Sequence, residues 1–117
     1  MSKFAPGVEM DRRQAPRIAT QRAGKVLGGT FAWDCVIRDM SDNGLRVQML
    51  AGVRPPVRAQ LVDLLDGVAW DVDTIWQKDR EFGFRVIKTY DLRGLTPASA
   101  RLAKNIWAAS QGRVSAS

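Results

Sequence analysis

The chain has 117 residues, of which 45% are hydrophobic and 26% charged, and this composition suits one soluble domain with a core of its own. One cysteine and no histidine exclude a disulfide framework and a zinc site of paired cysteines, and they remove the commonest general base. Because there is neither a signal-like apolar run nor a stretch of membrane-spanning length, we expect a cytoplasmic protein without membrane insertion.

The net charge of +6 is concentrated near the N-terminus. Residues 1–25 contain six basic and two acidic side chains, whereas the other 92 residues contain twelve basic and ten acidic ones. A nucleic-acid-binding domain more often spreads its positive charge along a face or a groove. This distribution favours an N-terminal arm that binds a compact anionic ligand or an anionic surface of a partner.

Six short strands are predicted after an irregular arm that spans residues 1–17. The arm lacks apolar periodicity and is interrupted by Pro6, Gly7 and Pro16. In the segments that follow, apolar and polar residues alternate, which is typical of strands with one buried face. Turn signals lie at residues 28–30, 43–44, 66–67 and 78–81. The predicted strands cover residues 18–27, 31–37, 45–49, 57–65, 68–76 and 82–86.

The regular spacing of these segments predicts an all-β domain, a small six-stranded antiparallel β-barrel over residues 18–95. After it, Thr96 as a cap and Pro97 in the first turn predict a C-terminal α-helix over residues 96–110. Residues 111–117 are small and polar, and we expect them to form a frayed tail of the same single domain. The expected apolar face of the helix consists of Ala98, Leu102, Ile106 and Ala109, with Trp107 at its edge.

Two short motifs point to a ligand. Arg13 and Arg17 are separated by three residues, and residues 39–44 read DMSDNG. In order and spacing they resemble the RxxxR and (D/N)xSxxG motifs of PilZ domains, and the resemblance extends over residues 11–110. It implies a six-stranded barrel that acts as a receptor for the bacterial second messenger cyclic di-GMP, with an N-terminal loop that wraps the ligand.

The arginines match the chemistry of such a ligand. Cyclic di-GMP is a dianion with two guanines, and an arginine fork can donate two hydrogen bonds to the O6 and N7 atoms of a guanine. Arginine also pairs with phosphates and stacks on flat rings. The resemblance therefore implies that Arg13 and Arg17 clamp guanine edges and phosphates. In the family that this chain resembles, an arginine directly before the motif, as Arg12 is here, goes with binding of a stacked ligand dimer, so the resemblance implies two molecules per chain.

The second motif supplies complementary groups. Asp39 is an acceptor for the N1 and N2 protons of guanine, and Ser41 can donate or accept a hydrogen bond to the base or a phosphate. Gly44 lets backbone and ligand approach closely because it has no side chain. In isolation, each motif has a plainer interpretation: a solvated basic arm, or an ordinary turn in which Asp39 and Ser41 bond the local backbone.

The functional prediction is a cyclic di-GMP receptor that signals to an unidentified downstream protein, which controls motility, exopolysaccharide or pili. Neither a nucleophile–base pair nor a cluster of metal ligands is visible, so we expect no enzyme, no metal and no cofactor. One alternative is a PilZ-like adaptor without ligand binding. Another is a small basic barrel that binds single-stranded nucleic acid, although its aromatic residues are expected to face inward rather than form a stacking platform.

The remaining notable residues are given structural roles. The buried set expected from strand periodicity consists of Trp33, Trp70, Trp76 and Cys35. Trp107 is either core against the barrel or an anchor for a partner. Asp71 and Asp73 are expected to be solvated polar positions on an outward strand face. The outward-facing side chains that could extend a ligand site are Arg46 and Arg85.

Overall fold

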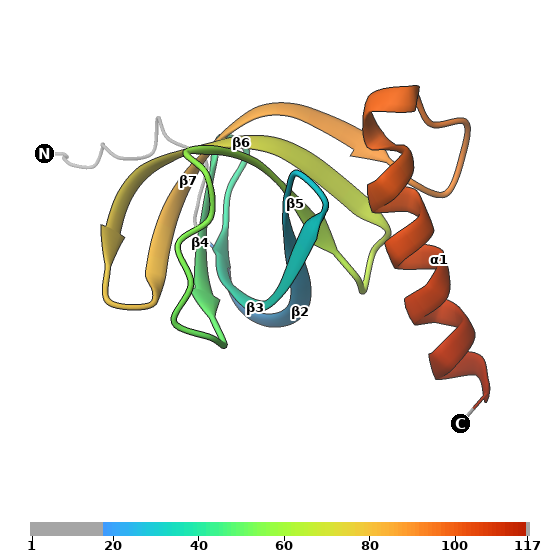
Figure 1. The fold of residues 1–117 in the computed structure, drawn as a ribbon, viewed down its shortest axis with the longest axis horizontal. Coiled ribbons are helices and arrows are strands. Elements are labelled where there is room, and N and C mark those ends of the chain that lie inside the picture. Colours follow the sequence, from blue (N-terminus) through green and yellow to red (C-terminus); the bar gives the residue numbers. More distant parts are fainter. Residues whose placement is uncertain (1–17, 117) are drawn as a thin grey trace, which may run out of the picture.

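The computed structural model describes residues 18–116 and places the side chains of residues 19–111. Within that part, six antiparallel strands close into a barrel in the order β2-β3-β4-β7-β6-β5 (Figure 1). The strands are β2 (Ile18–Gly28), β3 (Phe31–Met40), β4 (Gly44–Met49), β5 (Arg58–Asp63), β6 (Val68–Lys78) and β7 (Glu81–Asp91). The all-β barrel expected from the alternating pattern is confirmed. The arm expected over residues 1–17 lies outside the described residues.

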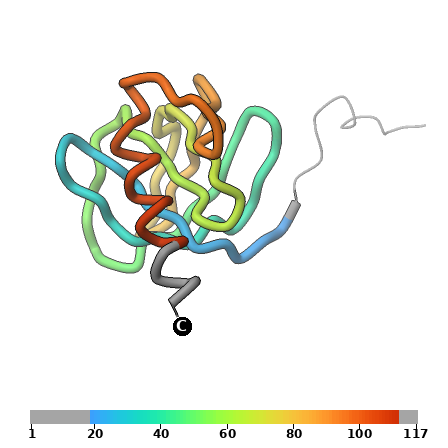
Figure 2. The backbone as a smooth tube through the Cα atoms, turned by 90° about the vertical axis from the view of Figure 1, so that its right-hand side faces the viewer, coloured from blue at the N-terminus to red at the C-terminus, as the bar shows by residue number. Residues whose placement is uncertain are grey.

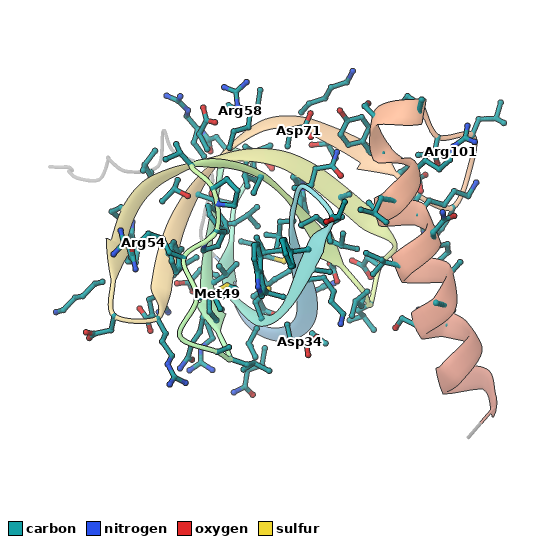
Figure 3. All side chains as sticks on the ribbon, viewed as in Figure 1. Asp34, Met49, Arg54, Arg58, Asp71 and Arg101 are labelled. Carbon is teal, nitrogen blue, oxygen red and sulfur yellow. The ribbon has the colours of Figure 1, made fainter. Side chains whose placement is uncertain are left out.

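The inside of the barrel is filled by alternate residues of all six strands. Phe82 and Phe84 pack there with their rings 6.1 Å apart, and both side chains are 1% exposed. Met49 lies inside as well (Figure 3). Cys35 is 1% exposed, and burial raises the pKa of its thiol to about 12, so the prediction of a buried small hydrophobe is confirmed. Each large apolar side chain buried in this way stabilises the barrel by about 1.5–3 kcal/mol.

The C-terminal helix covers part of the outer surface of the barrel. A single 3-10 turn, Ala98–Ala100, leads into α1 (Arg101–Ala116), which runs across the barrel wall (Figures 1 and 2). Val62 and Ala69 point outward from β5 and β6, and they form a second buried cluster with the helix. The other members of this cluster are Leu27, Tyr90, Leu92, Ala100 and Ala103, with Leu64, Ile106 and Trp107 partly buried against them.

The start and end of the helix differ from the prediction. Pro97 holds the cap position of the 3-10 turn, and the hydroxyl of Thr96 donates to the carbonyl of Gly94, so Thr96 does not cap the helix. The α-helix then continues to Ala116, past the predicted end at residue 110. The expected tail over residues 111–117 is therefore helical as far as residue 116.

The buried face of the helix is also different. Leu102 is 44% exposed, and Ala98 and Ala109 are exposed too, whereas Ala100 and Ala103 are completely buried. Within α1 the face that packs on the barrel runs through Ala103, Ile106 and Trp107. The 3-10 turn, with three residues per turn instead of 3.6, changes only where Ala98 and Ala100 lie relative to that face. Trp107 packs over Gly67, at the β5–β6 turn, which settles its position against the barrel.

Gly67 also explains how β5 and β6 are joined. Its φ of 71° lies in the left-handed region that favours glycine, as the turn signal at residues 66–67 predicts. The completely buried carboxylate of Asp63 accepts a hydrogen bond from the amide of Leu65 and pairs with Arg22 at 2.9 Å. This buried charge is therefore compensated, and the turn beneath the helix is held from two sides.

Candidate functional site

Strand pairing places the start of β2, the strand that follows the first motif in the chain, beside the second motif. Strand β2 pairs with β3, so that Ile18 lies opposite Met40 and Ala19 lies opposite Asp39. Arg17 directly precedes Ile18 in the chain, and consecutive Cα atoms are about 3.8 Å apart. The side chains of Arg12, Arg13 and Arg17 themselves lie outside the described residues.

Ser41 and Gly44 close the turn between β3 and β4. The hydroxyl of Ser41 donates to the carbonyl of Gly44 (3.1 Å) and accepts from its amide (3.2 Å). The amide of Ser41 donates to the same carbonyl at 2.9 Å. For Ser41 the local-turn interpretation is thus correct in this structure.

Gly44 is not required by the turn. Neither Gly44 nor Asn43 has a positive φ, contrary to what the turn signal suggested. A Cβ atom at residue 44 would meet the carbonyl oxygen of Phe84 at 3.5 Å and the hydroxyl of Ser41 at 3.7 Å, which are ordinary van der Waals distances. Gly44 also lines the cavity described below, where a bound molecule can approach.

A row of four residues crosses the outer face of four neighbouring strands. Asp39 on β3 lies opposite Arg46 on β4, Arg46 lies opposite Gly83 on β7, and Gly83 lies opposite Trp76 on β6. A cavity of about 250 Å³ opens along this row. The residues that line the cavity are Asp39, Gly44, Leu45, Arg46, Ile75, Trp76, Gly83 and Phe84.

Trp76 corrects one prediction and adds a residue to the site. It was expected in the core with Trp33 and Trp70, but its side chain is 41% exposed and lies across Gly83. A β-bulge between Thr74 and Trp76 shifts the alternation by one residue, which turns the indole outward. Gly83 was the available signal, since a glycine inside a strand often marks a close approach.

The other two tryptophans divide between the core and its edge. Trp70 is 8% exposed, as predicted. Trp33 is only partly buried, and it stacks on the exposed ring of Phe31 with the ring centres 5.8 Å apart. Phe31 begins its strand at a turn, so its side chain extends past the core.

Arg46 bonds two carboxylates at the charged end of the row, those of Asp39 and Glu81. Its Nε donates to Asp39 Oδ2 at 2.5 Å, and its Nη1 donates to Glu81 Oε1 at 3.1 Å. The hydrogen bond to Asp39 is the main reason why the pKa of Arg46 is raised. Asp39 therefore bonds a neighbouring strand rather than the local backbone. Arg46 lines the cavity, as expected of a residue that extends the site, whereas Glu81 was missed because its contact to Arg46 is non-local.

A second row lies two residues further along β4 and β7, and it continues across β6 to β5. Gly44 is opposite Arg85, Arg85 is opposite Asp73, and Asp73 is opposite Arg58. Arg58 donates to both oxygens of Asp73 at 2.7 and 3.0 Å, and Arg85 donates to Oδ2 at 3.3 Å. The bond from Arg58 is the main cause that lowers the pKa of Asp73.

The sequence suggested that Asp71 and Asp73 are merely solvated polar positions, and the structure shows that this prediction is wrong. Asp71 accepts hydrogen bonds from the amide of Gln60 (2.9 Å) and from the hydroxyl of Tyr90 (2.7 Å). Both carboxylates connect neighbouring strands on the outside of the barrel. Figure 3 shows Arg58 and Asp71 on that outer surface.

Comparison with protein-family models finds no match, and a search of curated proteins finds none either. In the described part of the chain, no helix is long and apolar enough to cross a membrane. Over the same residues, no three His, Cys, Asp or Glu side chains are grouped in a way that could hold a metal ion.

Proposed function

We propose that this protein is a PilZ-type receptor for cyclic di-GMP, and that it passes the signal to a partner protein. The observation that carries the proposal is the pairing of Ala19 with Asp39. Arg17, the last residue of the arginine motif, directly precedes the strand that pairs beside the Asp39–Gly44 turn. This adjacency supports reading the two motifs, each weak alone, as parts of one site.

The cavity offers groups that suit a guanine base. Asp39 accepts hydrogen bonds and is 17% exposed at its side chain, so a guanine can present its N1 and N2 protons to it. The indole of Trp76 provides a flat surface on which a base can stack. The ligand would lie in the cavity that Gly44 lines, and Arg13 and Arg17 from the arm would clamp its guanine edges and phosphates.

The proposal extends to stoichiometry and output. Arg12 would help to hold a second, stacked ligand molecule, so that each chain binds two. An arm that becomes ordered around a ligand changes the surface that a partner meets, and such ordering costs about 2–5 kcal/mol that the arginine contacts must offset. The protein would thus act in the cytoplasm as a binding module and not as an enzyme.

The test is a calorimetric titration of the purified protein with cyclic di-GMP, beside Arg13→Ala and Arg17→Ala. Loss of one charge-assisted contact should weaken binding by about 1.5–3 kcal/mol, which is roughly tenfold to more than a hundredfold. Arg101→Ala is the matched control, because Arg101 is exposed at the start of α1, away from the cavity (Figure 3).

The result that contradicts the proposal is equally clear. If no saturable binding is found at high ligand concentration, the protein is not a cyclic di-GMP receptor, and the adaptor alternative gains support. If a single-stranded oligonucleotide binds more tightly, with a steep salt dependence, the nucleic-acid alternative is favoured. A stoichiometry of two ligand molecules per chain would support the role of Arg12, and a stoichiometry of one would remove it.

A further inference from the structure

The second row of outer-face residues adjoins the cavity and is not part of either motif. Arg85 stands between Gly44 and Asp73 in this row, directly opposite each of them on the neighbouring strands. Residues directly opposite one another on antiparallel strands share a face. Because Gly44 has no side chain, the surface beside Arg85 on that side is bare backbone, and it continues into the cavity that Gly44 lines.

The three arginines of this face differ in how firmly they are held. Arg46 is fixed between two carboxylates, and Arg58 makes two hydrogen bonds to Asp73. Arg85 makes one long contact of 3.3 Å to Asp73, and its side chain is 60% exposed. If Arg85 turns away, Asp73 remains paired with Arg58, so no carboxylate is left without a partner. Arg85 is therefore the arginine that can be redirected at least cost.

The polar groups of the two rows match the two parts of a nucleotide. In the row at the cavity the charges of Asp39 and Arg46 balance, and Glu81, which bonds Arg46 from the next row, lies opposite Lys78. The neighbouring row combines two arginines with Asp73 and carries one net positive charge. Asp39, as an acceptor, suits the donor edge of a guanine, and the positive row suits a phosphodiester. The rows are two residues apart along the strands, about 7 Å.

We propose that Arg85 is a further ligand-contacting residue, which leaves Asp73 and donates to a phosphodiester oxygen of the bound cyclic dinucleotide. The inference rests on the proposed function, and it adds a contact from the barrel wall to those expected from the arm. Arg58 keeps Asp73 neutralised when Arg85 moves. A guanidinium can donate two hydrogen bonds to one phosphate, which a lysine cannot reproduce.

The experiment compares Arg85→Ala, Arg85→Lys and Lys88→Ala with the unmodified full-length protein in calorimetric titrations with cyclic di-GMP. Lys88→Ala removes the same charge from the same strand, three residues nearer the helix, and therefore controls for net charge. We expect Arg85→Ala to weaken binding about tenfold to a hundredfold, Arg85→Lys to restore part of the loss, and Lys88→Ala to change affinity less than about threefold. Thermal unfolding checks that the exposed substitutions leave the fold intact.

Two different results separate the inference from the function on which it rests. If the unmodified protein binds but Arg85→Ala and Lys88→Ala behave alike, Arg85 is not a contact and the inference is overturned, while the receptor function stands. If the unmodified protein does not bind at all, both are wrong. The affinity difference between Arg85→Ala and the unmodified protein should persist at raised salt. If that difference disappears, the direct contact is also overturned, because a purely long-range effect is screened within about 10 Å at 0.1 M salt.

Discussion

The two ends of the β6–β7 hairpin differ in what lies on their outer face. Near its open end, Ala69 and Tyr90 are buried beneath α1, together with Leu92 just beyond β7. Near its turn, Trp76 and Gly83 line a cavity among charged side chains. Figure 1 shows the helix and the β6–β7 turn on opposite sides of the barrel. One hairpin thus combines an end that contributes apolar burial with an end available for binding.

The middle of the hairpin joins these two ends through polar contacts. The hydroxyl of Tyr90 donates to Asp71, and Gln60 donates both to Asp71 and to the carbonyl of Ser99 before α1. Two β-bulges, between Asp71 and Val72 and between Thr74 and Trp76, lie on the same stretch. The comparison indicates that stability and binding can be altered separately, and the following substitutions test that separation.

The largest effect is expected at the covered end. Ala103 is completely buried between α1 and the barrel, so Ala103→Glu would place an unpaired charge in an apolar interface. This should lower the free energy of unfolding by about 3–5 kcal/mol, as measured by urea denaturation. Ala108→Glu adds the same charge on the exposed side of the helix and should change the free energy by no more than about 0.5 kcal/mol. Equal effects would show that the helix does not depend on this contact.

A smaller effect, on binding rather than on stability, is expected at the cavity end. Gly44→Ala meets only ordinary contacts, so the free energy of unfolding should change by less than about 1 kcal/mol. The added methyl group occupies the space that the ligand needs, and cyclic di-GMP affinity should fall about tenfold. Gly52→Ala is the control, because nothing lies within 4 Å of a Cβ atom there. Unchanged affinity would mean that the ligand does not approach Gly44.

The smallest effect concerns the link between the ends. Tyr90→Phe removes the hydrogen bond to Asp71 and should lower the free energy of unfolding by about 1 kcal/mol at neutral pH. That bond is the main reason why the pKa of Tyr90 is raised, so its contribution is present below about pH 10 and is lost as the pH rises further. The stability difference between the two proteins should therefore shrink above pH 10.

Urea denaturation at several pH values measures this difference. The protein contains one tyrosine, so the absorbance of tyrosinate reports the ionisation of Tyr90 directly. A titration midpoint at or below about pH 10 in the folded protein would contradict the raised pKa.

Much of the barrel followed from the sequence because each strand alternates in a local pattern. Leu45, Val47 and Met49 are buried in turn on β4, as their spacing indicated. The alternation failed where the backbone departs from regular geometry. A bulge turned Trp76 outward. On the helix, the face through Ala103, Ile106 and Trp107 packs on the barrel instead of the one through Leu102. Neither outcome has a clear local signal in the sequence.

The site was predictable only in part for a related reason. The residues of the second motif were found because they are adjacent in the chain, and Asp39 and Gly44 do line the cavity. The contacts of Asp39 with Arg46, and of Arg46 with Glu81, join residues that lie seven and 35 positions apart. Strand register creates such contacts, and the register is fixed by turns and bulges across the whole barrel.

The close packing of Trp76 on Gly83 has a consequence for the history of this surface. A side chain at residue 83 would overlap the indole as it lies here, so the glycine is constrained for as long as the tryptophan stays in place. A lineage that loses the glycine must first exchange the tryptophan for something smaller, and one that keeps the tryptophan must keep the glycine. Sequences descended from a common ancestor of this chain should therefore show the two positions covarying as a pair.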